Sequence, residues 1–214
     1  MIVLALDTAG PRPSVVLRLA DAAFEEALPG DRRASEELLP AIRRVLERAG
    51  IGLERCERLA VCAGPGSFTG VRVGLATAWG FSRARGIALE AVSTLEALAE
   101  TARASGAASA AAFLDAGRGE LVAERFDLTG PRARSLAPAS RCRAEEASAF
   151  SGGSQVAALP ESLVAPAAPP PSMSLAAALA AAVARDPGRV VPLDRPIPAL
   201  YSRPSAAEEK HGAA

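Results

Sequence analysis

Histidine and lysine are almost absent from this chain of 214 residues. Its one histidine, His211, and its only lysine, Lys210, both lie at the C-terminal end. A catalytic imidazole must be held in place by its surroundings, so a histidine in a mobile tail cannot serve Ser-His-Asp or Cys-His chemistry. The position of Lys210 likewise excludes a phosphate-loop lysine and a Schiff-base lysine. Carboxylates, hydroxyls, arginines and backbone amides are left for chemistry.

Cysteine is also scarce. Cys56, Cys62 and Cys142 are odd in number and lack the paired spacing of zinc ligands, so we expect reduced thiols, a cytoplasmic location and no metal site. The apolar run 2–6 has no charged region before it and is interrupted by Asp7. The sequence therefore predicts neither a signal peptide nor a membrane span.

Positive charge shows no surplus, because 24 Lys and Arg balance 24 Asp and Glu, and aromatic residues make up only 4%. Proteins that bind nucleic acid alone usually carry a basic surplus, so a free-standing tRNA-binding module is disfavoured. The best nucleic-acid candidate is a run without intervening acids, for which a solvated loop is the simpler interpretation: Arg132, Arg134, Arg141 and Arg143.

Hydrophobic residues make up 50% of the chain, enough for one large domain or two small lobes. The segment 3–10 reads as a buried strand that ends in Leu-Asp and a turn, and 111–117 repeats this pattern. We therefore predict an α/β protein with a duplicated, ribonuclease H-like, two-lobe actin-like or sugar-kinase-like ATPase fold. The predicted parts are a first lobe with the partner-binding helices, a smaller second lobe with a Pro/Ala-rich linker at 160–171, and a C-terminal segment and tail: 1–105, 106–189 and 190–214.

Two acids and a glycine loop are the candidate ligand contacts. Asp7 and Asp115 follow the first strand of each lobe, where they either help to hold metal and phosphate or cap their own turns. The loop 64–70 lies between an expected strand and a helix expected at about 71–84, where amides can bind an anion. The residues predicted as nucleotide or phosphate contacts are Asp7, Thr8, Gly64, Gly66 and Ser67.

A small ATPase or kinase that uses Asp7, the loop 64–70 and Asp115 is the alternative. Arg118 stands where the second lobe would need a glycine for close backbone approach to phosphate, which argues against this enzyme.

Four helices are expected from their capping and periodicity. Ser35 can cap a helix whose regular part is expected to start at Pro40 and to stop at Gly50. The helix after the glycine loop carries glycines at helical spacing, which allow another backbone to approach closely. A capping box at 93–96 predicts a helix to about residue 104, and a short helix is expected at 174–185.

These motifs together resemble the TsaB (YeaZ-type) family of glycoprotease-like proteins. The resemblance rests on Asp7-Thr8, the Ser-Glu-Glu-Leu-Leu-Pro run at 35–40, the Gly-Pro-Gly-Ser-Phe-Thr-Gly-Val-Arg-Val-Gly-Leu-Ala run at 64–76, and the segments 92–98 and 199–203. It is strong over residues 1–128 and returns near the C-terminus.

The resemblance implies a non-catalytic subunit that pairs with its catalytic paralogue TsaD and with the ATPase TsaE. Together they transfer a threonylcarbamoyl group to the adenosine beside the anticodon of tRNA. ATP and metal would belong to the partner subunits, tRNA would be bound only through the complex, and the isolated chain could form a homodimer. Thr94 and Leu98 stand where TsaD has its two metal-binding histidines. The absent ligands also argue against a metallopeptidase, the historical name for relatives.

The helices of the first lobe are the expected partner interface, since each has apolar or small residues on more than one side. The alternative is that both helices only cover their own sheet. The predicted interface residues are Leu38, Leu39, Ile42, Leu46, Val71, Gly74, Leu75 and Ala78.

Overall fold

The first half of the chain forms a five-stranded mixed sheet with the order β3-β2-β1-β4-β5. In this computed structural model the described residues are 1–29, 34–158, 171–187, 190–192, 197 and 199–200. The strands are β1 (Val3–Asp7), β2 (Ser14–Arg18), β3 (Ala23–Ala27), β4 (Arg58–Cys62) and β5 (Ala88–Val92). β1 is antiparallel to β2 and parallel to β4, and every residue of β1 is buried. This explains the continuous apolar run, because both faces of the central strand are covered.

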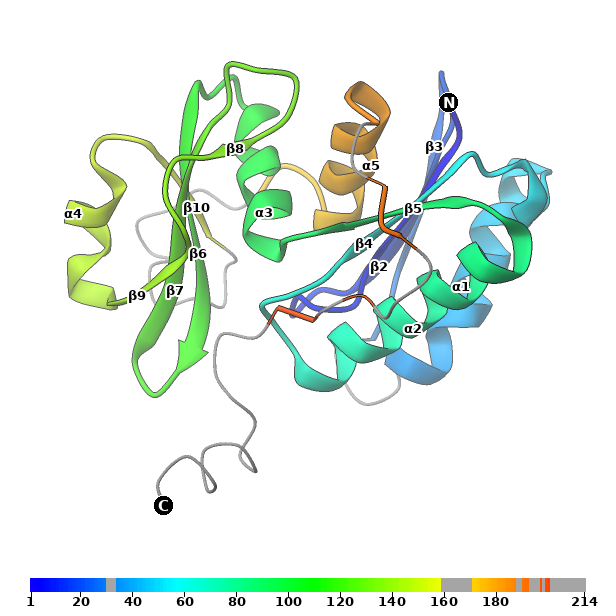
Figure 1. The fold of residues 1–214 in the computed structure, drawn as a ribbon, viewed down its shortest axis with the longest axis horizontal. Helices are drawn as coiled ribbons and strands as arrows, with labels where there is room; N and C mark the ends of the chain where they lie inside the picture. The colour runs from blue at the N-terminus through cyan, green and yellow to red at the C-terminus, as the bar shows by residue number, and fades with distance from the viewer. Residues whose placement is uncertain (30–33, 159–170, 188–189, 193–196, 198, 201–214) are drawn as a thin grey trace.

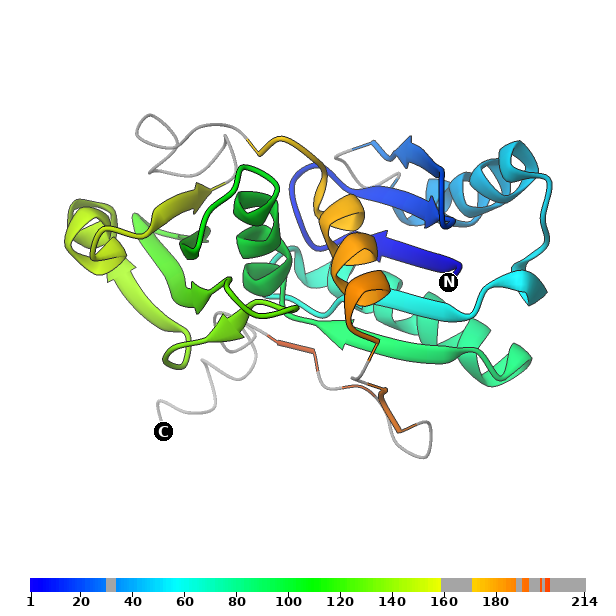
Figure 2. The same cartoon turned by 90° about the horizontal axis from the view of Figure 1, so that it is seen from above.

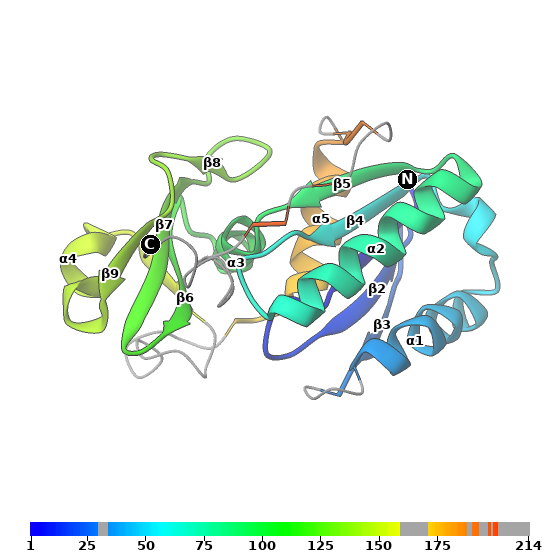
Figure 3. The same cartoon turned by 60° about the horizontal axis from the view of Figure 1, so that its bottom comes forward.

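Helices cover both faces of this sheet (Figures 1 and 3). On one face lie α1 (Ala34–Ala49) and α2 (Phe68–Arg85), with a short 3-10 turn at Leu53–Arg55. The other face packs against α5 (Leu175–Arg185), which in turn contacts α3 (Thr94–Arg103).

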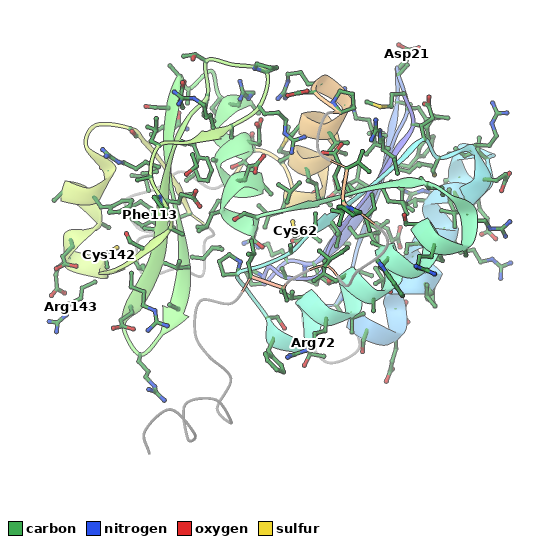
Figure 4. All side chains as sticks on the ribbon, viewed as in Figure 1. Asp21, Cys62, Arg72, Phe113, Cys142 and Arg143 are labelled. Carbon is green, nitrogen blue, oxygen red and sulfur yellow. The ribbon has the colours of Figure 1, made fainter. Side chains whose placement is uncertain are left out.

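The second sheet has the order β10-β6-β7-β8, with β9 also paired to β7. Its elements are β6 (Ser109–Gly117), β7 (Glu120–Asp127), β8 (Arg134–Ser135), β9 (Ser140–Arg143), a 3-10 turn (Ala144–Glu146), α4 (Ala147–Ser151) and β10 (Gln155–Ala158). α3 covers one face of this sheet. On the other face, Phe113 of β6 meets Phe150 of α4 edge to face at 5.6 Å (Figure 4). The molecule is thus a stack of five layers, helix, sheet, helix, sheet, helix (Figure 2).

The two sheets repeat one pattern, which confirms the duplicated two-lobe, actin-like fold. In each, the first strand is antiparallel to its hairpin partner and parallel to a later strand, β4 for β1 and β10 for β6. Each hairpin turn also holds an acid that accepts backbone N–H groups. Oδ1 of Asp7 accepts from Ala9 and Gly10 at 2.9 and 3.1 Å. Oδ1 of Asp115 accepts from Gly117 at 2.6 Å. Both acids therefore cap their turns.

Some expected helix boundaries were wrong. α1 begins at Ala34, so Ser35 lies inside the helix and Pro40 does not start it. A proline inside a helix removes one backbone hydrogen bond at a cost of about 3 kcal/mol, which burial of an apolar helix face can outweigh. α2 begins at Phe68 instead of at residue 71, because the Ser67 hydroxyl accepts the Gly70 N–H at 3.2 Å and caps the helix earlier.

The helix at 94–103 begins where expected but without a full capping box. Ser93 accepts the Leu95 N–H at 3.2 Å, one residue before the N–H that a capping box uses, and Glu96 binds Arg132. The short helix near the C-terminus is confirmed as α5, capped by Ser174, which accepts the Ala177 N–H at 3.1 Å.

The place of α5 differs from the sequence-based division. Residues 106–189 were assigned to the second lobe, but α5 contacts β1, β2 and β4 of the first sheet. One buried apolar cluster includes residues of both sheets and of α3 and α5. The division at residue 105 stays a prediction. The linker at 160–170 and the tail with Lys210 and His211 lie outside the described residues.

Asp7 is a carboxyl group in an apolar setting. It is fully buried, and among the described residues Oδ2 has no hydrogen-bond partner. Burial raises the pKa of Asp7 from 3.8 to about 6, and the Gly10 and Ala9 amides only partly offset this shift. The folded protein therefore holds this proton to a higher pH than the unfolded chain does. The contribution of Asp7 to stability is greatest below about pH 4 and is lost as the pH rises through about 6.

We predict that Asp7→Asn removes this pH dependence, since asparagine has no charge to bury and keeps an oxygen for the Ala9 and Gly10 amides. Relative to the unchanged protein, the variant should gain up to about 3 kcal/mol of unfolding free energy between pH 4 and pH 7. Urea unfolding across this range measures the difference. Asp115→Asn makes the same chemical change in an exposed turn and is the control. A gain for Asp7→Asn that does not vary with pH would contradict the prediction.

Candidate functional site

The glycine loop packs directly on the turn that follows β1. The Ser67 amide donates to the Ala9 carbonyl at 2.8 Å, and the Thr8 hydroxyl donates to the Gly70 carbonyl at 2.6 Å. The Gly64 carbonyl accepts the Thr94 amide at 2.8 Å, at the start of α3. The loop therefore joins the first hairpin to the beginnings of α2 and α3.

The glycines of this loop are explained by close packing. A Cβ atom at Gly66 would meet the Ala9 carbonyl, and one at Gly70 would meet the Thr8 carbonyl. At Gly74 it would meet Oγ1 of Thr8. No larger residue fits where helix and turn approach so closely.

A segment from the C-terminal part of the chain covers the other end of the loop. The Leu200 amide donates to the Ala63 carbonyl at 2.8 Å, and a Cβ atom at Gly64 would meet the Leu200 carbonyl. Gly64 also has a φ of 96°, which side chains other than glycine rarely adopt. An internal carbonyl thus occupies the space that a side chain at Gly64 would need.

The five predicted nucleotide contacts do lie together at this junction. Asp7, Thr8 and Gly64 are buried, whereas Gly66 and Ser67 are exposed. The amides of Ser67 and Gly70 are already used inside the protein. An anion contact here stays a prediction. Asp115 is exposed in the second hairpin.

The start of α3 carries apolar or small residues where the catalytic paralogue is expected to have metal ligands. Thr94 and Leu98 are both fully buried. Nearby, burial and then the charge of Asp7 raise the pKa of the Cys62 thiol well above its usual value (Figure 4). Over the described parts of the chain, no three or more His, Cys, Asp or Glu side chains gather as metal ligands would.

Most of the predicted interface residues cover the lobe's own sheet. Six of the eight are buried in this chain: Leu38, Ile42, Val71, Gly74, Leu75 and Ala78. Leu46 is half-buried, and only Leu39, at 55% exposure, points fully to solvent. The buried six cannot touch a partner in this arrangement, because a helix residue faces either the sheet or the surface.

A different set of residues forms the outer face of these helices. Phe68 of α2 is 48% exposed, and Ala76 and Gly80 follow it at helical spacing on the exposed side. The Arg72 guanidinium lies 3.3 Å from the centre of the Phe68 ring. Figure 4 shows Arg72 at the outer side of α2. In the sequence, this outer face could have been found from the residues spaced four apart between 68 and 80. It was missed because the sheet-facing residues of the same helix give a similar apolar pattern.

The four arginines of the run do not form one exposed basic patch. The structure therefore contradicts the hypothesis that they make a single nucleic-acid-binding surface. Arg132 is buried, with only 6% exposure. The other three arginines pair with neighbouring acids: Arg134 with Asp127 at 3.0 Å, Arg141 with Glu120 at 3.8 Å and Arg143 with Glu145 at 3.7 Å.

Comparisons with known proteins agree with the fold and with the resemblance. A family model described as TsaD, tRNA N6-adenosine threonylcarbamoyltransferase, matches residues 30–192. The solved structure of YeaZ from Pseudomonas aeruginosa superposes with a TM-score of 0.73 at 26% identity, over 93% of this chain and 99% of that chain.

Two curated relatives are tRNA threonylcarbamoyladenosine biosynthesis proteins TsaB. The one from Escherichia coli K12 is 37% identical over 125 residues, which are 56% of this chain and 53% of that protein. The one from Haemophilus influenzae is 35% identical over 102 residues, 48% of this chain and 43% of that protein. This chain thus matches about half the length of these relatives. The TsaD family model spans more than half of the chain, the two curated relatives are TsaB proteins, and the superposed structure is YeaZ. This chain therefore belongs to the TsaD-type family and, within it, to the TsaB/YeaZ proteins.

Proposed function

We propose that this protein is a non-catalytic subunit in the biosynthesis of threonylcarbamoyladenosine in tRNA, and that it pairs with a TsaD-type transferase and with the ATPase TsaE. The threonylcarbamoyl group would be transferred by the partner to the adenosine beside the anticodon, in the cytoplasm. ATP and metal would be held by the partner subunits, and tRNA would be bound only through the complex.

The observation that carries this proposal is the second, solvent-facing side of α1 and α2. Both helices already bury one side on their own sheet, yet Leu39 of α1 and Phe68, Ala76 and Gly80 of α2 remain exposed. Small residues let a partner helix approach closely, and large apolar anchors carry most of the energy of an interface. We therefore assign the interface to this outer face. Of the eight interface residues predicted from the sequence, Leu39 is the one that this assignment retains.

The chemistry of the chain supports a non-catalytic role. The positions expected to bind metal in the transferase hold Thr94 and Leu98, which are buried in the core. In the loop that could bind phosphate, the Ser67 amide donates to the Ala9 carbonyl, and the Leu200 carbonyl lies close to Gly64.

An ATPase or kinase is the second candidate, because Asp7, Thr8 and the glycine loop converge at one place. The close fit of the glycines to the chain's own carbonyls speaks against phosphate in that position.

We predict that Leu39→Asp and Ala76→Asp leave the melting temperature within about 2 °C of the unchanged protein, since both residues face solvent. Each should weaken binding to the TsaD-type partner at least about 30-fold, because a charge would enter an apolar contact without a counterion. Calorimetry and co-elution of the mixed proteins measure the loss.

Leu38→Asp is the matched control, one residue away and fully buried. It should lower the stability by several kcal/mol, because it buries an unpaired charge. If Leu39→Asp and Ala76→Asp both retain full binding, the interface lies elsewhere.

We also predict that the purified protein holds no stoichiometric zinc or iron, does not turn over ATP and does not modify tRNA until partner proteins are added. Elemental analysis after dialysis against a chelator, and a phosphate-release assay, check the first two. Retained metal would contradict the non-catalytic proposal. ATP turnover that Asp7→Asn abolishes would favour the second candidate, an ATPase or kinase activity of this chain.

A further inference from the structure

Arg132 connects the two lobes through buried charges. It lies after β7 in the second lobe, and Nη1 donates to Oε2 of Glu90 at 3.1 Å. Nη2 donates to Oε1 of Glu96 at 3.1 Å. Glu90 belongs to β5 of the first sheet and Glu96 to α3, and all three side chains are at most 8% exposed. One guanidinium therefore bridges three elements.

The segment that carries Arg132 is held by further polar contacts. Oε1 of Glu100, on α3, accepts the Ala133 amide at 2.6 Å, and its Oε2 pairs with Arg103 and Arg185 at 2.7 and 3.1 Å. Arg185 of α5 also donates to the Pro131 carbonyl at 2.9 Å.

Two arginine side chains of this region also donate hydrogen bonds to backbone carbonyls. Arg103 donates to the carbonyls of Leu128 and Gly130, the latter at 2.9 Å. Arg132 donates to the Asp186 carbonyl at 3.0 Å. The Arg132 cluster comprises Glu90, Glu96, Glu100, Arg103, Arg132 and Arg185.

Buried ion pairs contribute little to stability in total, because desolvation offsets their attraction. Loss of one partner is costly, however, since it leaves a buried charge unpaired. Separation of the lobes at this segment would break the pairs of Arg132 with Glu90 and Glu96. It would also expose apolar surface, because one core cluster runs from the first sheet through α3 and α5 to β6 and β7.

From this geometry we infer that the Arg132 cluster fixes the two lobes as one rigid body, so that they do not open and close about the layer of α3 and α5. Two-lobe enzymes commonly close around a bound ligand by a hinge motion. This chain has the two lobes, but its buried bridge opposes such a motion. The inference does not depend on the partner or on the reaction.

Distances between spin labels on the two lobes test the inference. Glu47→Cys on α1 and Glu145→Cys in the second lobe are suitable sites, with side chains 58% and 73% exposed. They are placed in a Cys142→Ser background, since Cys56 and Cys62 are buried. We expect one narrow distance distribution for the otherwise unchanged protein. A broad distribution or two populations would overturn the inference.

Arg132→Met should broaden the distribution and raise amide exchange in residues 128–133 at least about tenfold. Arg134→Met is the matched control, because this arginine is 70% exposed and makes only a surface pair with Asp127. It should leave both readouts unchanged. Equal effects of the two substitutions would overturn the inference.

A triple variant distinguishes the effect of losing the Arg132 ion pairs from the effect of lowering the stability of the whole protein. Glu90→Gln, Glu96→Gln and Arg132→Met together remove the charges without leaving one unpaired, so the protein should melt closer to the unchanged protein than Arg132→Met does. Its label distances should nevertheless be broad. If Arg132→Met does not fold, the triple variant replaces it, and a narrow distribution in the triple variant would overturn the inference.

Discussion

The first and second sheets share the two helices between them, and most of the structure depends on this layer. α3 contacts β6, β7 and β10, whereas α5 contacts β1, β2 and β4, and the two helices contact each other. Each sheet therefore buries its inner face against helices that belong to a common layer, and the apolar core continues from one lobe to the other. An alanine-rich α5 suits this position, because small side chains allow a helix to lie close to both a sheet and a second helix.

The same layer places polar groups in the interior, where they must be paired. Glu90, Glu96 and Glu100 are all nearly inaccessible to solvent. The segment after β7 pairs Arg132 with Glu90 and Glu96 and donates the Ala133 amide to Glu100, which offsets part of the cost of burying these charges. The glycine loop, the first hairpin and the start of α3 also meet through backbone hydrogen bonds.

The outer side of the first lobe has a different character. α1 and α2 place most of their apolar residues on the sheet but leave Leu39, Phe68, Ala76 and Gly80 toward solvent. A surface of this kind combines anchors with room for a neighbouring helix. Within the part of the chain that the structure describes, no helix is both long and apolar enough to cross a bilayer. The exposed apolar anchors and small residues are the reason that we propose a protein partner for this face.

The sequence alone was enough for the first hairpin, its repeat at 111–117, the helix that opens after Ser93, the short helix at 174–185 and the family resemblance. These depend on local signals, namely an apolar run closed by an acid, a capping hydroxyl and a glycine loop between strand and helix. Only the tertiary structure decided the place of α5, the burial of Arg132 and which side of α1 and α2 faces outward. Helical periodicity shows that a helix has two faces but not which of them meets the sheet, and an arginine in a loop gives no local sign of the acids that it will meet. The contact between Arg132 and Glu90 joins residues far apart in sequence, so it exists only after both sheets have packed on the same pair of helices.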